Sequence, residues 1–187
     1  MSQRPSPRHG AGVTLIELLV VIALASLLAG IAVPSFNDTI RRNRIDTAAN
    51  TFLNALNYAR TEAIRRNTYI TLRKSGAQWE NGYQAFVDSN GDGNINNGEV
   101  MIRTWQGLPA GYTLRSNHAN FTNFVRYNAR GEVDNNAIGG HFIVCYNNQP
   151  QGARAVILTR MRPVLAADTN GNGVPESDSA DIASCGT

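Results

Sequence analysis

The sequence has few of the residues that most catalytic and transition-metal sites use. It contains three histidines and two cysteines in 187 residues. His118 and His141 have no carboxylate or cysteine nearby in the sequence that would complete a ligand set or a catalytic triad, and His9 lies at the far N-terminus. We therefore expect a protein that is not an enzyme, with no catalytic residues and no cofactor other than a possible calcium ion.

Lysine is almost absent, and arginine supplies nearly all of the positive charge. Of 17 basic residues only Lys74 is a lysine. Residues 101–165 hold seven arginines against two carboxylates, a formal charge of +5, whereas residues 166–187 hold four carboxylates and no basic residue. Because the planar guanidinium binds phosphate and carboxylate groups through paired hydrogen bonds, the middle of the domain is suited to an anionic partner.

Long apolar runs are also scarce, and the sequence has one, from Val13 to Val33. As a helix these 21 residues would span about 31 Å, the thickness of a hydrocarbon core. We predict a single transmembrane segment over residues 13–33. Glu17 breaks the run, and a carboxylate in a membrane helix usually has a functional partner. The alternative is a cleaved secretory signal with its site at Ala23-Leu24-Ala25, although its apolar region would be unusually long.

The helical pattern continues beyond the apolar run. Apolar residues recur at spacings of three and four from Ile45 to Ala63, which is typical of one buried helix face. Only Pro34, Ser35 and Asn37 separate this stretch from the apolar run, which favours a kink at Pro34 over a break. We predict one helix of about 55 residues whose second half, residues 34–67, is amphipathic.

After Asn67 the apolar period changes from that of a helix to that of a strand. We expect seven short strands, at 69–74, 83–87, 100–106, 112–116, 123–128, 141–147 and 153–159, separated by turns rich in glycine and asparagine. The predicted fold class is α+β, with the apolar face of the helix packed on an antiparallel sheet. Residues from Ala166 onward are predicted to be irregular and tied down by Cys185. Cys145 and Cys185 would form a disulfide in an oxidising compartment and remain two thiols in the cytosol.

The segment from Asp88 to Glu99 fits the calcium-loop pattern of the EF-hand. Its oxygen ligands would be Asp88, Asn90, Asp92, the Asn94 carbonyl and a bidentate Glu99. An EF-hand loop joins two helices, however, whereas this loop joins two predicted strands, so a structural connection rich in asparagine and glycine is the alternative. Residues 168–173 repeat the start of the pattern, but Ser179 stands where the final acidic ligand should be.

Three arginines near the end of the last predicted strand form the second candidate site. Arg154, Arg160 and Arg162 share parity, so they would project to one face if the strand stays regular. Such a stripe suits the backbone of double-stranded DNA, bound without sequence preference. The alternative is an ordinary solvated face.

The N-terminus resembles a known family of secreted filament proteins. G12-V-T-L-I-E17 is similar to the type III signal of type IV prepilins, in which a prepilin peptidase cuts after the glycine and the new N-terminal residue is methylated. Counted from Val13, Glu17 is the fifth residue and Pro34 the twenty-second, the places where pilins carry their glutamate and their helix-kinking proline. The segment from Asn43 to Asn67 resembles the FimT/GspH-type minor pilins and pseudopilins, and the Y127-N-A-R-G131 turn resembles theirs as well.

The resemblance implies a pilin fold and a processing site. Residues 1–12 would be the prepilin leader, cut between Gly12 and Val13, and residues 68–187 a β domain in the periplasm. The protein would be a single-pass inner-membrane protein that enters the pilus fibre, and the periplasmic location favours the Cys145–Cys185 disulfide. Its implied partners are other pilins, the prepilin peptidase and the inner-membrane assembly platform, with Glu17 meeting the N-terminal amine of a neighbouring subunit.

The resemblance also bears on DNA. FimT-like minor pilins of competent bacteria are implicated in DNA binding through a Gly-Arg-x-Arg motif, and Thr159-Arg160-Met161-Arg162 matches its arginines but lacks its glycine. We expect a FimT-like minor pilin acting in pilus assembly and in DNA uptake for natural transformation. The alternatives are a GspH-like pseudopilin of a type II secretion system and a calcium-stabilised, membrane-tethered periplasmic binding domain.

Overall fold

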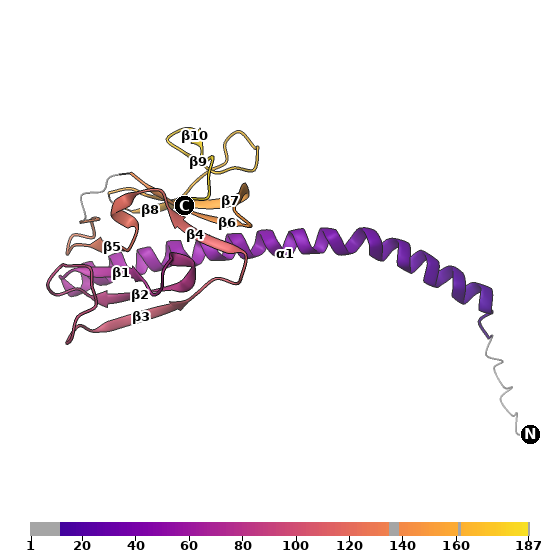
Figure 1. Cartoon of the computed structure of the whole chain (residues 1–187), viewed down its shortest axis with the longest axis horizontal. Coiled ribbons are helices and arrows are strands. Elements are labelled where there is room, and N and C mark those ends of the chain that lie inside the picture. The colour runs from indigo at the N-terminus through magenta and orange to yellow at the C-terminus, as the bar shows by residue number, and fades with distance from the viewer. Residues whose placement is uncertain (1–11, 135–138, 161, 187) are drawn as a thin grey trace, which may run out of the picture. The chain divides into compact units, whose positions relative to one another are not determined.

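One long helix, α1 (Leu15–Arg66), is followed by a β domain (Figure 1). The computed structural model describes residues 12–134, 139–160 and 162–186, without the side chains of residues 31–35. The 52 residues of α1 match the predicted helix of about 55. The side chain of Pro34 lies outside the described residues, so the kink stays a prediction. Internal contacts divide the chain into residues 1–40 and residues 41–187.

In the second unit, the predicted apolar face of the helix is buried. Ile45, Ala49, Phe52, Leu56, Ala59 and Ala63 are each at most 2% exposed. The helix ends at Arg66 and is followed by Asn67, whose positive φ of 53° suits an asparagine in the left-handed region. The Thr68 N–H donates to the Ala63 carbonyl. In the last turn, hydrogen bonds from Arg65 and Arg66 hold the pKa of Glu62 below its ordinary value. The amphipathic half of α1 therefore contributes one complete face to the domain core.

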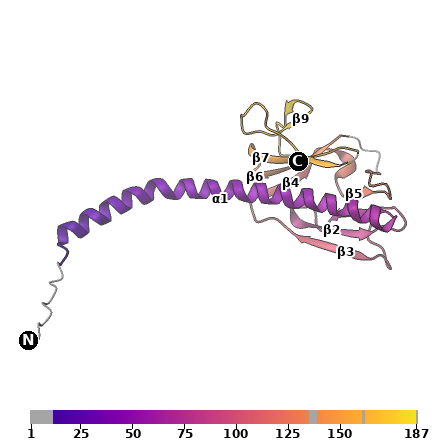
Figure 2. The ribbon, with the colours of Figure 1, turned by 180° about the vertical axis from the view of Figure 1, so that it is seen from behind.

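Two four-stranded antiparallel sheets flank this half of α1, one on either side in both views (Figures 1 and 2). The first has the order β3-β2-β1-β5 and the second β4-β6-β7-β8, so the predicted α+β class is confirmed. The strands of the first sheet are β1 (Ile70–Lys74), β2 (Gly82–Val87), β3 (Met101–Gln106) and β5 (Phe124–Tyr127). Those of the second are β4 (Tyr112–Ser116), β6 (His141–Tyr146), β7 (Gln149–Leu158) and β8 (Pro163–Leu165).

The C-terminal part of the chain is more regular than the sequence predicted. The strand predicted at 153–159 begins at Gln149, because Asn147 and Asn148 both take positive φ angles and close a two-residue turn with β6. Beyond β7 the chain forms β8 and then the pair β9 (Glu176–Ser177) and β10 (Ala180–Asp181). The prediction of a wholly irregular tail is therefore wrong, because these short segments gain strand structure from pairing with other strands rather than from their own composition.

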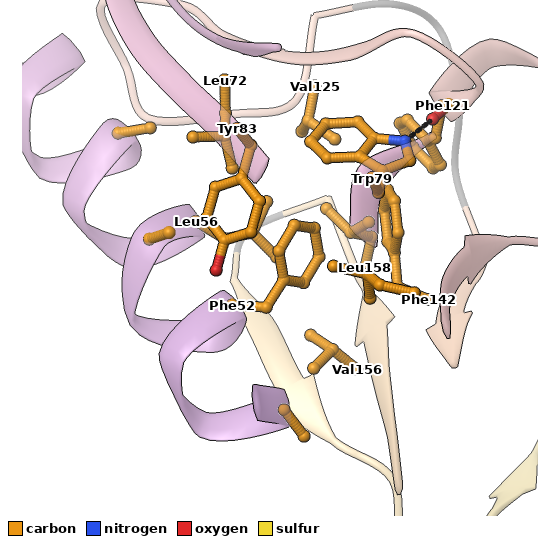
Figure 3. Packing of buried hydrophobic residues seen from close by; sticks show 14 of the residues in the cluster. Phe52, Leu56, Leu72, Trp79, Tyr83, Phe121, Val125, Phe142, Val156 and Leu158 are labelled. Atoms are coloured by element: carbon orange, nitrogen blue, oxygen red, sulfur yellow. Dashed lines mark hydrogen bonds between the residues drawn. The ribbon is translucent and has the colours of Figure 1, made fainter. Parts of the chain in front are cut away.

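Phe52 joins the helix to both sheets (Figure 3). Its ring centroid lies 5.2 Å from that of Tyr83 on β2 and 4.6 Å from that of Phe142 on β6. Trp79, in the short 3-10 helix Trp79–Asn81, packs edge-on against Phe52 at 5.5 Å and donates its indole N–H to the Phe121 carbonyl at 3.0 Å. One aromatic cluster therefore holds α1 and both sheets together.

The face of the second sheet that points away from α1 carries a smaller buried cluster, which holds the C-terminal segment from Ala166 onward against the sheet. Cys145 on β6 and Cys185 form the predicted disulfide, with an S–S distance of 2.04 Å and a Cα–Cα distance of 6.0 Å. Ile143, Ala153, Ala155 and Ile182 are buried around it. The tail thus covers a sheet face that would otherwise expose apolar side chains.

Candidate functional site

The predicted processing site lies just before α1. Gly12 and Val13 are outside the helix, and Val13 is 71% exposed. Thr14 caps the first turn, since its hydroxyl accepts from the Glu17 N–H at 3.3 Å and its carbonyl accepts from the Leu18 N–H at 3.1 Å. This cap was not predicted from the sequence, although a threonine three residues before a glutamate is the signature of a capping box. Residues 1–11 of the predicted leader lie outside the described residues.

Glu17 stands in the first turn of α1 with its side chain exposed. A carboxylate there interacts favourably with the positive end of the helix dipole. In the cap Glu17 donates its backbone N–H, so the capping does not occupy the carboxylate. The side chain is therefore placed to meet a cation from outside its own helix.

The first half of α1 exposes large apolar side chains all round. Leu15, Ile16, Leu18, Val21 and Leu28 are between 55% and 77% exposed. A helix that is apolar on every side needs lipid or neighbouring protein to cover it. In the part of the chain that the structure describes, no helix meets both the length and the apolarity of a membrane span.

The three candidate arginines do not lie on one regular strand. β7 ends at Leu158, and Thr159 closes a tight turn by donating its hydroxyl to the Arg162 carbonyl at 2.6 Å. Arg160 and Arg162 are exposed on this turn, and Met161 lies outside the described residues. The condition for a common face, a regular strand through Arg162, is therefore not met, because the strand ends at Leu158 and parity applies only within a strand.

Arg154 lies elsewhere, in the middle of β7. Four residues of strand, about 13 Å, separate it from Leu158, where the turn begins. Its Nε donates to Oδ1 of Asp46 on α1 at 2.7 Å. Arg154 is thus grouped with the helix rather than with Arg160 and Arg162.

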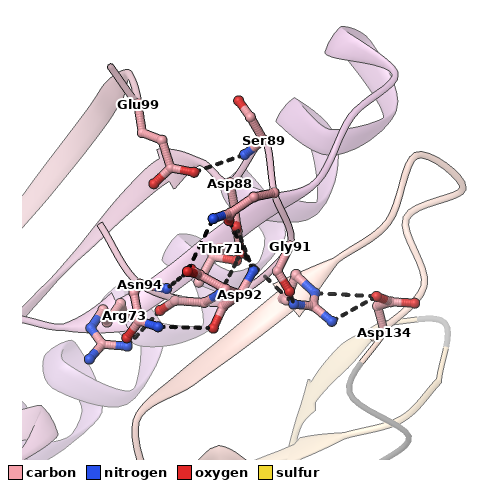
Figure 4. Close-up of polar contacts among 12 residues, drawn as sticks. Thr71, Arg73, Asp88, Ser89, Gly91, Asp92, Asn94, Glu99 and Asp134 are labelled. Atoms are coloured by element: carbon pink, nitrogen blue, oxygen red, sulfur yellow. Dashed lines mark hydrogen bonds and ion pairs between the residues drawn. The ribbon is translucent and has the colours of Figure 1, made fainter. Parts of the chain in front are cut away.

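The loop from Asp88 to Glu99 is organised around the buried carboxylate of Asp88 (Figure 4). Oδ2 of Asp88 accepts from the Thr71 hydroxyl at 2.6 Å and from the Gly93 N–H at 3.0 Å, and Oδ1 accepts from the Asp92 N–H at 3.1 Å. Glu99 accepts from the backbone N–H groups of Ser89 and Asn96. Asp88 and Glu99, the first and last ligands of the predicted calcium loop, therefore both accept hydrogen bonds from backbone N–H groups.

Two arginines bring positive charge to the same loop. Arg126 on β5 places Nη1 4.0 Å from Oδ2 of Asp88 and donates to the Gly91 carbonyl, while Arg73 on β1 donates to the Gly93 carbonyl. Hydrogen bonds from Asn96 and from the Asn94 backbone hold the pKa of Asp92 below its ordinary value. Among residues 12–134, 139–160 and 162–186, no three His, Cys, Asp or Glu side chains are grouped to hold a metal ion. Calcium binding stays a prediction, and Arg126 offers an alternative counter-charge for Asp88.

The loop from Asp168 to Gly173 has the same hydrogen-bond pattern. Asp168 accepts from the N–H groups of Asn172 and Gly173 at 3.1 and 2.8 Å, just as Asp88 does from Asp92 and Gly93. The side chain of Asn170 accepts from Asn172, as that of Asn90 does from Asp92. The repeated D-x-N-G-[DN]-G sequence thus produces one loop structure twice, and this structure needs only side-chain-to-backbone hydrogen bonds.

Two family models match the chain. The family described as type II transport protein GspH matches residues 48–161, which is more than half of the chain. The prokaryotic N-terminal methylation motif matches residues 7–33 and so includes Gly12, Val13 and Glu17. Together the two matches cover the apolar run, most of the amphipathic half of the helix and most of both sheets.

Relatives and solved structures agree with these matches. The pilin-like protein PilA1 of Thermus thermophilus is 36% identical over 93 residues, which is 50% of this chain and 58% of that protein. The chain therefore matches little more than half of this relative's length. The type IV minor pilin FimU of Pseudomonas aeruginosa, in two crystal forms, superposes with TM-scores of 0.61 and 0.58 at 23% and 22% identity. The first covers 78% of this chain and 97% of FimU, the second 75% and 98%, which shows a common fold.

Proposed function

The chain belongs to the family of the type II transport protein GspH, and from this membership we propose that it is a minor type IV pilin of the FimT kind. The precursor is cut between Gly12 and Val13 by a prepilin peptidase, and Val13 is methylated. Residues 13–33 anchor the protein in the inner membrane, with the β domain in the periplasm. An assembly platform then transfers it into a pilus beside other pilins.

The exposed apolar half of α1, with Glu17 in its first turn, is the observation that carries this proposal. Its side chains are exposed in the isolated chain, so a stable state must cover them. Lipid covers them before assembly and the helices of neighbouring pilins cover them afterwards. In that bundle a buried carboxylate requires a cation, and cleavage at Gly12 creates one as the amine of Val13. N-terminal sequencing tests the first step: a mature chain that begins after Ala25 would contradict the proposal.

We expect Glu17→Ala to be inserted and cleaved normally but to enter pili at least about tenfold less often. Removing one partner of a buried ion pair leaves the other charge uncompensated, which costs several kcal/mol. The measurement is the ratio of the protein in sheared pili to that in membranes, by immunoblot. Glu17→Gln is the matched variant, because it keeps the side-chain size and removes only the charge. Normal incorporation of Glu17→Gln would refute the charge-pairing role.

We also propose that the β7–β8 turn binds the backbone of incoming double-stranded DNA. Arg160 and Arg162 are exposed on this turn, and their guanidinium groups suit phosphate oxygens. The turn lies in the basic stretch of residues 101–165, so the field there favours a polyanion. Arg154 is not part of this surface, since it is paired with Asp46.

Replacing Arg160 and Arg162 by alanine should weaken DNA binding equally for all sequences and flatten its salt dependence. Each phosphate that the protein no longer neutralises lowers the slope of log K against log salt by about 0.9, so the slope of the double variant should fall by nearly 2. An electrophoretic titration of the full chain in non-ionic detergent, repeated at several salt concentrations, measures both the DNA affinity and its salt dependence. An Arg44→Ala/Lys74→Ala variant removes the same charge elsewhere and serves as control. Equal weakening in both double variants would mean that net charge, rather than the turn, binds DNA.

A second candidate function is that of a minor pseudopilin in a type II secretion system. The family match favours it, because the matched family is described by type II transport. Both functions use the same processing and the same fold, so the site geometry does not separate them. Deleting the gene separates the two functions. Loss of surface pili supports the first, and loss of protein secretion with normal pili supports the second.

A further inference from the structure

Strand β3 of the first sheet pairs with a neighbour on one side only. In the order β3-β2-β1-β5 it lies at an end, and both views show it as the outermost strand of this sheet (Figures 1 and 2). It pairs regularly with β2 over residues 103–106, and the register shifts between Arg103 and Met101. Within the described part of the chain no strand pairs with its other side. Because successive residues of a strand point their backbone groups to opposite sides, about half of the N–H and C=O groups of β3 stay unpaired.

The chain itself closes or shortens the other edges of its two sheets. Beside β5 the following segment folds back, with a bridge between Tyr127 and Val133. At β4 the Leu114 N–H donates to the Glu80 carboxylate at 3.4 Å, and β8 has only three residues. The edge of β3 is therefore the longest one that the described residues leave open.

The composition of β3 does not protect this edge. Its six residues contain no proline or lysine, and Arg103 is their one charged residue. Met101 is 42% exposed, and Val100, just before the strand, is 57% exposed. Prolines and charged side chains usually keep edge strands from pairing with other chains, so an apolar edge of this kind is suited to a partner strand.

Arg103 is held in place on β3 by aromatic rings and has no carboxylate partner among the described residues. Its guanidinium carbon lies 5.4 Å from the ring centroid of Tyr58 on α1 and 5.0 Å from that of Trp105. Trp105 stacks on Tyr83 at 5.5 Å, and Tyr83 packs against Phe52 in the core. Aromatic rings attract a guanidinium, but they do not accept paired hydrogen bonds from it as a carboxylate does. A positioned cation thus stands beside the open edge.

We propose that β3 binds an extended acidic segment of a second protein, which adds a fifth strand to the first sheet and pairs a carboxylate with Arg103. In strand addition the main-chain hydrogen bonds supply affinity, and side chains on one face supply specificity. The carboxylate would accept two parallel hydrogen bonds from the guanidinium. All of the residues involved belong to the unit of residues 41–187.

The open edge favours a polypeptide over a nucleic acid as the partner. A DNA backbone could contact Arg103, but it has no row of alternating N–H and C=O groups to pair with a strand. It would also leave the apolar side chains of Val100 and Met101 uncovered. An extended peptide pairs with the backbone groups and covers these side chains at the same time.

The test uses the full chain in maltoside detergent, titrated with a short acetylated peptide of alternating threonine and valine around one central glutamate. Tryptophan fluorescence follows binding, because Trp105 touches Arg103 whereas Trp79, the other tryptophan, is buried. We expect the peptide to bind and to slow the amide hydrogen exchange of β3. The same peptide methylated on every backbone nitrogen is the control. It should bind at least about tenfold more weakly, because it donates no main-chain hydrogen bonds.

Arg103→Gln and a peptide with glutamine in place of glutamate complete a double-mutant cycle. We expect Arg103→Gln to bind the glutamate peptide about threefold to fivefold more weakly than the wild type does, as for an exposed ion pair. It should bind the glutamine peptide like the wild type. Arg44→Gln is the matched control, because Arg44 is an exposed arginine on α1 and its loss changes the net charge equally. We expect it to bind both peptides like the wild type.

The outcomes separate the possible occupants of the edge. Equal weakening in Arg103→Gln and Arg44→Gln would overturn the pairing with Arg103, and equal binding of the methylated peptide would overturn strand addition. The proposal would also fail if millimolar peptide did not bind. Protection of the β3 amides that rises with protein concentration, without peptide, would show a second copy of the chain in place of another protein. Binding is measured without assembly, so its outcome is independent of the function proposed above.

Discussion

Replacing Asp88 with alanine will lower the free energy of unfolding by about 3–5 kcal/mol, because three hydrogen-bond donors lose their acceptor at about 1–3 kcal/mol each. The Asp88 carboxylate is fully buried and accepts three hydrogen bonds while facing Arg126. The variant leaves the Thr71 hydroxyl and two backbone N–H groups without their acceptor, and Arg126, only 15% exposed, without this counter-charge. Chemical denaturation of the full chain in detergent measures the decrease.

Asp168→Ala is the matched control for this prediction. Asp168 accepts the same two backbone bonds in a loop of the same structure, but it is only half-buried. Within the described part of the chain its carboxylate binds backbone N–H groups rather than a threonine or arginine side chain. We expect the variant to lower the free energy of unfolding by about 1 kcal/mol, as the removal of a helix cap does. Equal decreases in the two variants would show that the loop structure, rather than the burial of Asp88 and its hydrogen bond from Thr71, accounts for the effect.

The same variants test the calcium prediction. A ligand that binds only the folded state raises the melting temperature. If Asp88 binds calcium, adding calcium will stabilise the wild type and leave Asp88→Ala unchanged. We expect the melting temperature of the wild type to be the same in calcium and in chelator, because backbone N–H groups and arginines already meet the acidic groups of this loop.

The second large effect is expected from the disulfide. Replacing Cys145 and Cys185 together by alanine should lower the free energy of unfolding by about 4 kcal/mol, from the loop entropy of the 40 residues that the bond encloses. The tail covers Ile143, Ala153 and Ala155 and has little other apolar contact, so it should detach first. Faster proteolysis after Ala166 than elsewhere would indicate this detachment.

Reduction gives the control for the disulfide. Reductant should lower the stability of the wild type to that of the double variant and leave the double variant unchanged. A double variant as stable as the oxidised wild type would mean that the small cluster of apolar residues around Ile182 holds the tail without the bond.

Most of the helix and the sheets could be predicted because their signals are local. The 3.6-residue period from Ile45 to Ala63 predicted the buried face of α1, and alternation predicted six strands to within a residue or two. The seventh, β7, was placed correctly but begins four residues earlier than predicted. The short strands β8, β9 and β10 were missed, since two or three residues carry no period of their own.

For the candidate sites, too, prediction succeeded for residues close together in the sequence and failed for contacts between distant residues. Gly12, Val13 and Glu17 lie within six residues of one another, and their spacing carries the resemblance to type IV prepilins that implies processing and assembly. Arg154 was grouped with Arg160 and Arg162 because the three share parity in the sequence, yet Thr159 turns the chain between them. The partner of Arg154 is Asp46, 108 residues away, and no local pattern joins the two.

By itself, the sequence therefore determines the helix, its exposed apolar half, the family and the disulfide chemistry, because each depends on residues close together or on a residue type used only twice. The folded domain decides which arginines share a surface, that Arg154 pairs with Asp46, and that Asp88 faces Arg126. The physical reason is range: periodicity and capping act over a few residues, whereas charge pairing depends on which distant segments the core brings together.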